Sequence, residues 1–174
     1  QGMICSVREL EIGDDHDGIW VLPEDSEIGA PVADALGLND WVIEIDNKSL
    51  THRPDLWGHR GIATELAAIY HRPLKPISFD WPEWSDGAPY PIRIDTPACS
   101  RYLGLPIDGA KATPSPDWLR WLLLAVGQRP IDCLVDLSNF VMLDLGQPNH
   151  TFDRHSLDPE GISIRMAREG EGMR

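Results

Sequence analysis

Three polar side chains in the C-terminal part of the sequence could take part in a hydrolytic reaction. Ser138 and Asn139 are adjacent, and His150 follows directly after a Gly-Gln-Pro-Asn stretch. A hydroxyl, an amide and an imidazole can together orient a water molecule and an ester, and His is the side chain most often used to transfer a proton. Each residue also has a structural interpretation, because Ser and Asn bond readily to nearby backbone and a single His often only packs.

Other polar residues could bind a metal ion, but their spacing does not favour it. Residues 14–17 read Asp-Asp-His-Asp within a turn, and nothing in the sequence completes a coordination shell, so we expect a solvated acidic loop. His52 and His59 lie near a predicted helix start, with no third ligand at a suitable spacing. The three cysteines form no CxxC pair and are expected to be reduced and packed. We predict no metal site.

The charge balance limits the partners that this chain can bind by itself. With 28 acidic and 15 basic residues, its formal net charge is −13. Nucleic acids are bound through basic surfaces, so we expect poor binding of nucleic acid by these residues alone. No glycine-rich phosphate loop or nucleophile elbow is present, which gives no support to ATP use or acyl-enzyme chemistry within the chain.

Targeting signals are not evident in the sequence. The longest apolar runs, such as residues 122–126, are far shorter than the roughly 18 residues of a membrane span. The first residues lack the basic start and apolar segment of a signal peptide. We therefore expect a soluble, cytoplasmic protein with no membrane partner.

Three helices are predicted from apolar residues at helical spacing and from start and stop signals. They cover residues 56–70, 116–126 and 131–145. We expect Asp55 to cap the first helix and Ser115 to cap the second. A glycine directly follows both the second and the third helix and should end them.

Five short segments carry the β-branched or alternating pattern that is typical of strands. They are residues 19–22, 41–46, 92–94, 102–107 and 162–166. The fourth contains a glycine and a proline, which suit an edge strand or a bulge. We therefore predict an α+β fold without internal repeats.

A proline-rich stretch divides the predicted elements into two groups. Residues 75–91 contain four prolines, so no regular element should persist there. We place a domain boundary between residues 77 and 90. A small β-rich and helical N-terminal unit would precede it, and a mixed α+β domain would follow.

One long stretch resembles a known family. Residues 129–153 follow, nearly position by position, the signature RPI-x-x-x-VD-[TS]-N-[YF]-VM-L-x-x-x-QP-x-H-x-FD of the β subunit of bacterial phenylalanine-tRNA ligase. Residues 50–58 and 100–104, followed by 114–116, resemble the same family in the same order. The chain departs from it by Thr51-His52 in place of Pro-Asn, and by Ser138-Asn139-Phe140 in place of Thr-Asn-Tyr.

The resemblance implies a division of the chain and an activity. Residues 1–39 would be the end of an inserted, oligonucleotide-binding-like tRNA-binding domain, 40–76 a small helical segment, and 77–174 the first half of an editing domain. In the family this domain hydrolyses tyrosine wrongly attached to phenylalanine tRNA. A pocket for phenylalanine rejects an isostere with one added hydroxyl by only about 100-fold, so a second, hydrolytic site is required.

The family pattern also assigns roles to residues. His150 would be catalytic, and Ser138 and Asn139 would bind substrate. The parent enzyme would use ATP and magnesium, with phenylalanine tRNA and the α subunit as partners, whereas we expect no cofactor within this chain. A glutamate that recognises the tyrosine hydroxyl would lie beyond residue 174, so the isolated chain is expected to be inactive.

Two other interpretations remain open. The chain could be a noncatalytic scaffold or interaction surface, as its acidic surplus allows. It could also be a free-standing aminoacyl hydrolase of the same fold. The second is disfavoured, because residues 40–76 resemble the ligase alone.

Overall fold

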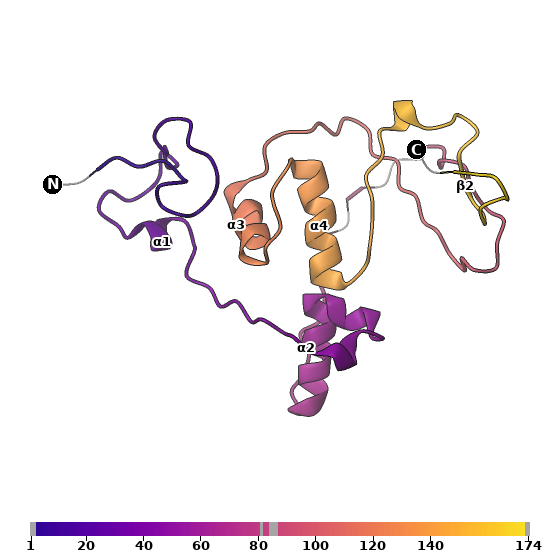
Figure 1. The fold of residues 1–174 in the computed structure, drawn as a ribbon, viewed down its shortest axis with the longest axis horizontal. Helices are drawn as coiled ribbons and strands as arrows, with labels where there is room; N and C mark the ends of the chain where they lie inside the picture. The colour runs from indigo at the N-terminus through magenta and orange to yellow at the C-terminus, as the bar shows by residue number, and fades with distance from the viewer. Residues whose placement is uncertain (1–2, 81, 84–86, 173–174) are drawn as a thin grey trace. The chain divides into compact units, whose positions relative to one another are not determined.

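The chain consists of two compact units, residues 1–43 and 44–174. The computed structural model describes residues 3–80, 82–83 and 87–172, and Figure 1 traces them. Most of the regular structure belongs to the second unit. In chain order the elements are α1 (Val32–Ala35), η1 (Lys48–Leu50), η2 (Pro54–Trp57), α2 (His59–Ile69), β1 (Ile92–Ile94), α3 (Asp117–Ala125), α4 (Cys133–Leu145), η3 (Arg154–Ser156) and β2 (Ile162–Ile164), where η marks a 3-10 helix.

Turns, rather than strands, organise the first unit. Glu9 accepts hydrogen bonds from the backbone N–H and the hydroxyl of Ser6, at 2.8 and 3.0 Å, and the Glu9 N–H donates back to that hydroxyl. The two bonds that the carboxylate accepts lower the pKa of Glu9, the one from the Ser6 backbone most. The strand predicted at residues 19–22 is wrong, since one backbone bond, from Trp20 N to Cys5 O, is not continued into a ladder in the described residues.

Two further predicted strands are also absent. Residues 41–46 and 102–107 contain no strand. Their β-branched pattern suits a half-buried strand, but both segments are largely exposed, with Trp41 at 92% and Leu103 at 82%. A strand needs a hydrogen-bonded neighbour as well as a suitable pattern, and neither segment has one among the described residues.

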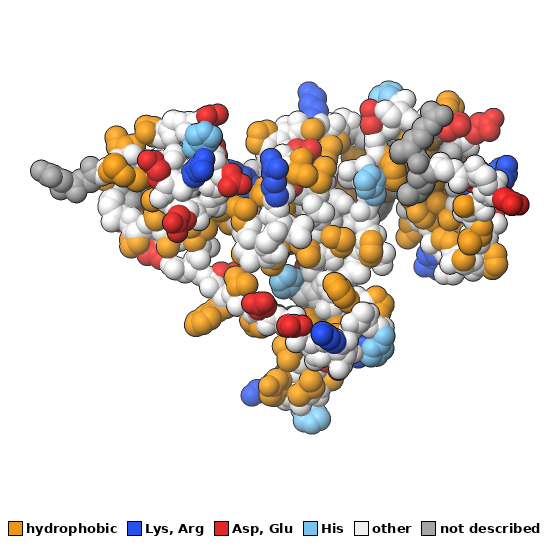
Figure 2. All heavy atoms as spheres, in the orientation of Figure 1, with side chains coloured by type: hydrophobic (Ala, Val, Ile, Leu, Met, Phe, Trp, Pro, Cys, Tyr) orange, Lys and Arg blue, Asp and Glu red, His pale blue; other side chains and the backbone are white. Residues whose placement is uncertain are grey.

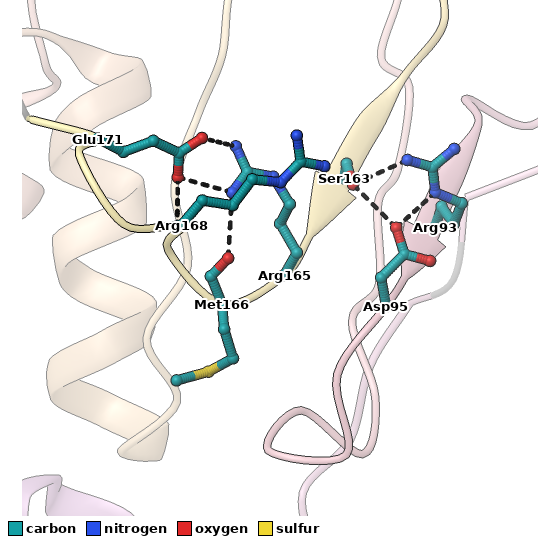
Figure 3. A network of polar contacts seen from close by, with 7 residues as sticks. All are labelled: Arg93, Asp95, Ser163, Arg165, Met166, Arg168 and Glu171. Atoms are coloured by element: carbon teal, nitrogen blue, oxygen red, sulfur yellow. Dashed lines mark hydrogen bonds and ion pairs between the residues drawn. The ribbon is translucent and has the colours of Figure 1, made fainter.

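A short parallel sheet forms from the other two predicted strands. β1 pairs with β2 in the register Ile92 to Ile162, and the Asp95 N–H extends the ladder by donating to Ile164 O at 2.7 Å. Figure 3 shows the polar link beside the ladder, in which Arg93 and Ser163 both contact the Asp95 carboxylate. Helices α3 and α4 lie between the strands in sequence, as a parallel connection requires.

Helix α2 begins later than the sequence indicates. Residues 54–57 form the 3-10 helix η2, and Gly58 is the N-cap of α2. Asp55 does not cap, so that prediction is wrong. Its carboxylate instead accepts two hydrogen bonds from the Arg53 guanidinium, at 2.7 and 2.9 Å. This pairing lowers the pKa of Asp55.

Helices α3 and α4 enclose the main core of the second unit and lie side by side (Figure 1). Leu119 and Leu123 of α3 are 0% and 1% exposed. The predicted serine cap of α3 is wrong. Pro116 is the N-cap, and the Ser115 hydroxyl bonds to Asp136 of α4 instead. That contact joins the two helices.

Glycines allow α2 to contact the C-terminal end of α4. A Cβ at Gly58 would lie 2.4 Å from the Gly146 nitrogen, and a Cβ at Gly61 would lie 1.6 Å from the Asp55 carbonyl oxygen. His59 Nδ1 lies 3.0 Å from the Leu143 carbonyl oxygen. The end of α4 is therefore held by a close backbone contact that a larger residue would prevent.

Large apolar side chains remain exposed on both units. Figure 2 shows hydrophobic side chains spread across the visible face. The most exposed include Ile28 at 101%, Trp41 at 92% and Leu103 at 82%. No helix in the part of the chain that the structure describes is long and apolar enough to cross a bilayer. Mixed helices and a parallel strand pair are compatible with the predicted α+β class, and the described part of 75–91 has no regular element.

Candidate functional site

The candidate site lies on α4 and on the loop that follows it. The Asp132 carboxylate accepts hydrogen bonds from the Leu134 and Val135 N–H groups and so caps the helix. Gly146 ends it in the left-handed conformation, at a φ of 73°. The predicted helix 131–145 and its glycine stop are confirmed to within two residues. Both ends of the helix are therefore determined by local signals.

Ser138 is joined to the loop through two reciprocal hydrogen bonds. Its hydroxyl donates to the Asn149 carbonyl oxygen at 3.1 Å, and the Asn149 amide donates to the Ser138 carbonyl oxygen at 3.0 Å. The same amide lies 3.4 Å from the Gln147 carbonyl oxygen. Ser138 precedes Gly146 by about two helical turns, or roughly 12 Å, so the loop folds back along α4. This brings the residue before His150 onto the helix.

His150 is exposed and lies against an aromatic ring. Its centroid is 4.5 Å from that of Phe152, with an angle of 60° between the ring planes. Asn139 is half-buried on α4, beside Phe140, whose ring makes an edge contact with Trp118 of α3 at 5.6 Å. Among the hydrogen bonds of the described residues, none joins Asn139 to Ser138 or His150. The structure thus connects Ser138 to the His150 loop but does not link Asn139 to it.

Two cavities in the second unit lie elsewhere. One, of about 690 Å³, is lined mainly by α2 and residues 72–75. The other, of about 400 Å³, lies between the proline-rich stretch and η3 and includes His155. Neither is lined by Ser138, Asn139 or His150. Convergence of these three side chains on a single cavity therefore stays a prediction.

A buried carboxyl group on α4 was missed by the sequence analysis. Asp136 is 0% exposed and accepts hydrogen bonds from the Ser115 hydroxyl at 2.5 Å and from the Ile131 N–H at 2.9 Å. Asp136 lies three residues after Cys133 and four before Phe140, so helical spacing places it on their face, which was the available signal. Asp136 joins the start of α3 to the start of α4, so it supports the helix that carries Ser138.

The largest pKa shifts belong to groups in surface ion pairs. The Arg165 guanidinium and the Arg168 N–H lower the pKa of Glu171 to about 2, the guanidinium most (Figure 3). The Asp55 and Glu65 carboxylates raise the pKa of Arg53. In the described residues, no group of three His, Cys, Asp or Glu side chains could hold a metal ion. The cysteines at 5, 99 and 133 are free thiols and are partly buried.

Comparison with known proteins connects this helix and loop to a family. Residues 98–174, which contain α3, α4 and the His150 loop, match the B3/4 domain. The chain is 44% identical to the phenylalanine–tRNA ligase beta subunit of Solibacter usitatus, over 98% of this chain and 22% of that protein. It is 42% identical to the subunit of Symbiobacterium thermophilum, over 98% of this chain and 20% of that protein. The chain is homologous to bacterial phenylalanine–tRNA ligase beta subunits.

That relationship confirms the resemblance found in the signature at residues 129–153. It also holds for the subunit of Chromobacterium violaceum, which is 39% identical over 99% of this chain. The chain spans about a fifth of the length of the curated relatives that it matches. The similarity to these subunits therefore extends over nearly the whole chain, whereas the roles of Ser138, Asn139 and His150 stay predictions.

Proposed function

We propose that the protein carrying this chain is the β subunit of a phenylalanine-tRNA ligase and that residues around α4 contribute to its editing site. There, tyrosine wrongly attached to phenylalanine tRNA is hydrolysed. The observation that supports this most is the loop of His150, held against α4 by the Ser138 and Asn149 hydrogen bonds within the B3/4 match. An exposed imidazole on a loop that hydrogen bonds hold in place is accessible to a large tRNA substrate.

In the proposed reaction, His150 accepts a proton from a water molecule as that water attacks the ester carbonyl carbon. The bond between this carbon and the ribose oxygen then breaks, and the proton returns to that oxygen. Free tyrosine and uncharged tRNA are the products, so atoms and charge balance. General base catalysis of this kind contributes about 10² to 10⁴ in rate. Asn139, half-buried nearby on α4, would bind the aminoacyl group through its amide.

The reason for such a site is chemical. Tyrosine differs from phenylalanine by one hydroxyl, and an apolar pocket rejects such an isostere by only about 100-fold. In the proposed parent enzyme, ATP and magnesium serve aminoacylation outside this chain, in a complex with the α subunit and phenylalanine tRNA. We place that complex in the cytoplasm. The net charge of −13 implies that the tRNA is held mainly by other parts of the enzyme.

The test uses the full-length protein assembled with its partner subunit and phenylalanine tRNA charged with tyrosine. His150→Ala should slow release of tyrosine at least 100-fold while aminoacylation with phenylalanine is kept. His155→Ala is the matched control, since this histidine lies five residues further on and lines the smaller cavity. It should keep the normal rate. Unchanged release of tyrosine by His150→Ala would refute the role of this residue.

A noncatalytic role is the second candidate. It is favoured by the extensive exposed apolar surface, which includes Trp41 and Leu103, and by the absence of His150 from the lining of either cavity. Exposed apolar surface of this kind is typical of protein contacts. If the wild-type, full-length enzyme releases tyrosine no faster than an enzyme lacking residues 98–174, the scaffold interpretation holds instead.

A further inference from the structure

In the loop segment 147–150, Asn149 is the only residue whose side chain is hydrogen-bonded both to α4 and to the loop itself. Its amide donates to the Ser138 carbonyl oxygen at 3.0 Å and lies 3.4 Å from the Gln147 carbonyl oxygen. The Ser138 hydroxyl donates back to the Asn149 carbonyl oxygen at 3.1 Å. We infer that Asn149 is a positioning residue that orients His150 for the proposed hydrolysis. This inference rests on the editing function proposed above.

The geometry gives the two donors of the Asn149 amide separate tasks. A helix-interior carbonyl such as that of Ser138 has a second lone pair, which can accept from outside the helix. The bond to Ser138 therefore holds the loop along α4 without breaking the helix. The contact with Gln147 holds the turn closed. Since His150 is the next residue, its backbone is fixed at one side by both contacts.

The other side of His150 is restrained by an aromatic contact. Its ring packs on Phe152 at 4.5 Å, which limits its side-chain rotation. With the backbone held by Asn149 and the ring held by Phe152, the imidazole has few orientations left. A catalytic group that is already oriented loses less entropy when the substrate binds, and this raises the rate of the chemical step.

The arrangement also changes the role expected for Ser138. Its hydroxyl proton is donated to the Asn149 carbonyl oxygen, so that proton is not offered to a substrate. The hydroxyl oxygen can still accept a hydrogen bond. Ser138 therefore acts with Asn149 in holding the loop. The signature at residues 129–153 specifies the histidine but leaves the position before it open, so the side-chain amide of Asn149 is not part of the signature.

Two variants separate the amide donors of Asn149 from the bulk of its side chain. Asn149→Asp keeps the shape but has no N–H to donate, and its carboxylate faces two carbonyl oxygens. Asn149→Gln keeps the donors, and the exposed loop has room for one more methylene. In the full-length enzyme with its partner subunit, we expect Asn149→Asp to lower kcat for tyrosine release about tenfold with little change in KM. Asn149→Gln should stay within about threefold of wild type.

Aminoacylation with phenylalanine should be unchanged in both variants, which shows that they fold. Equal rates in the two variants, whether normal or reduced, would overturn the inference, because the donors would then not matter. A rise in KM without a fall in kcat would also overturn it. His150→Ala is measured alongside. If it slows release while Asn149→Asp does not, the positioning role fails and the editing proposal stands. If His150→Ala has no effect, the editing role of His150 fails first.

Discussion

Removal of the buried Asp136 carboxyl group should loosen α4 from α3. In Asp136→Ala, the Ser115 hydroxyl, which is buried, and the Ile131 N–H, which is partly buried, both lose the acceptor that the fully buried Asp136 provides. An unsatisfied buried donor costs about 1–3 kcal/mol, so the two together should cost about 3 kcal/mol. Asp136→Asn should cost about 1 kcal/mol, because its amide oxygen can still accept from Ile131 and the Ser115 oxygen can accept from its NH₂.

Hydrogen exchange of the amides of residues 133–145, followed by mass spectrometry, measures this effect directly. A loss of 3 kcal/mol in the free energy of local opening corresponds to exchange about 100-fold faster, since about 1.4 kcal/mol is a factor of ten. Asp144→Ala is the matched control. Asp144 is half-buried on the same helix, and its side chain makes no hydrogen bond among those of the described residues. We expect a change below about 0.5 kcal/mol there.

The outcome that would refute the reasoning is equal exchange in Asp136→Ala and Asp144→Ala. A double-mutant cycle with Ser115→Ala gives a second check. Residues that share a buried hydrogen bond should show a coupling energy of about 0.5–3 kcal/mol. Strictly additive effects would mean that the contact between Ser115 and Asp136 does not stabilise the helix pair.

Three further predictions concern local contacts. Gly61→Ala places a Cβ 1.6 Å from the Asp55 carbonyl oxygen. It should lower the free energy of unfolding by about 2 kcal/mol and the thermal midpoint of the chain by roughly 4–8 °C. Gly172→Ala is the control and should change neither quantity, because nothing lies within 4 Å of its added Cβ. The pKa of Glu171 in the folded chain, about 2, lies below its ordinary 4.5, so its contribution to stability is present above pH 4.5 and is lost as the pH falls toward 2. Arg165→Gln should raise the titration midpoint of the Glu171 carboxyl carbon in an NMR titration, and an unmoved midpoint would contradict this. Asp132→Ala should cost about 1 kcal/mol through loss of the helix cap and speed exchange at the start of α4 about fivefold, while Asp132→Ser should be nearly neutral.

Helix α4 was the most predictable element, and the reason is local. Its capping carboxylate, apolar spacing and terminal glycine all act within one or two helical turns, and the structure has Asp132, Gly146 and the helix between them in these roles. Strands depend on a distant partner. Residues 92–94 and 162–164 pair as strands, whereas residues 41–46 carry an equally suitable pattern but are unpaired and exposed.

The capping predictions failed for a related reason. Asp55 and Ser115 both have side chains that can cap a helix, but each found a partner outside it. Asp55 bonds to the nearby Arg53 guanidinium, and Ser115 bonds to Asp136, which lies 21 residues further along the chain. A charged donor or a buried carboxyl group competes successfully with a helix N–H, because hydrogen bonds to ionised or buried acceptors are stronger.

From the sequence alone came the family signature, the helix of residues 131–145 with its glycine stop, and the choice of Ser138, Asn139 and His150 as candidates. These follow from residue types and short spacings. Only the tertiary structure revealed that Ser138 holds the His150 loop through Asn149, that Asp136 is fully buried, and that Gly58 and Gly146 touch. Such contacts join residues far apart along the chain, and their energies depend on burial and geometry that arise only when separate elements pack together.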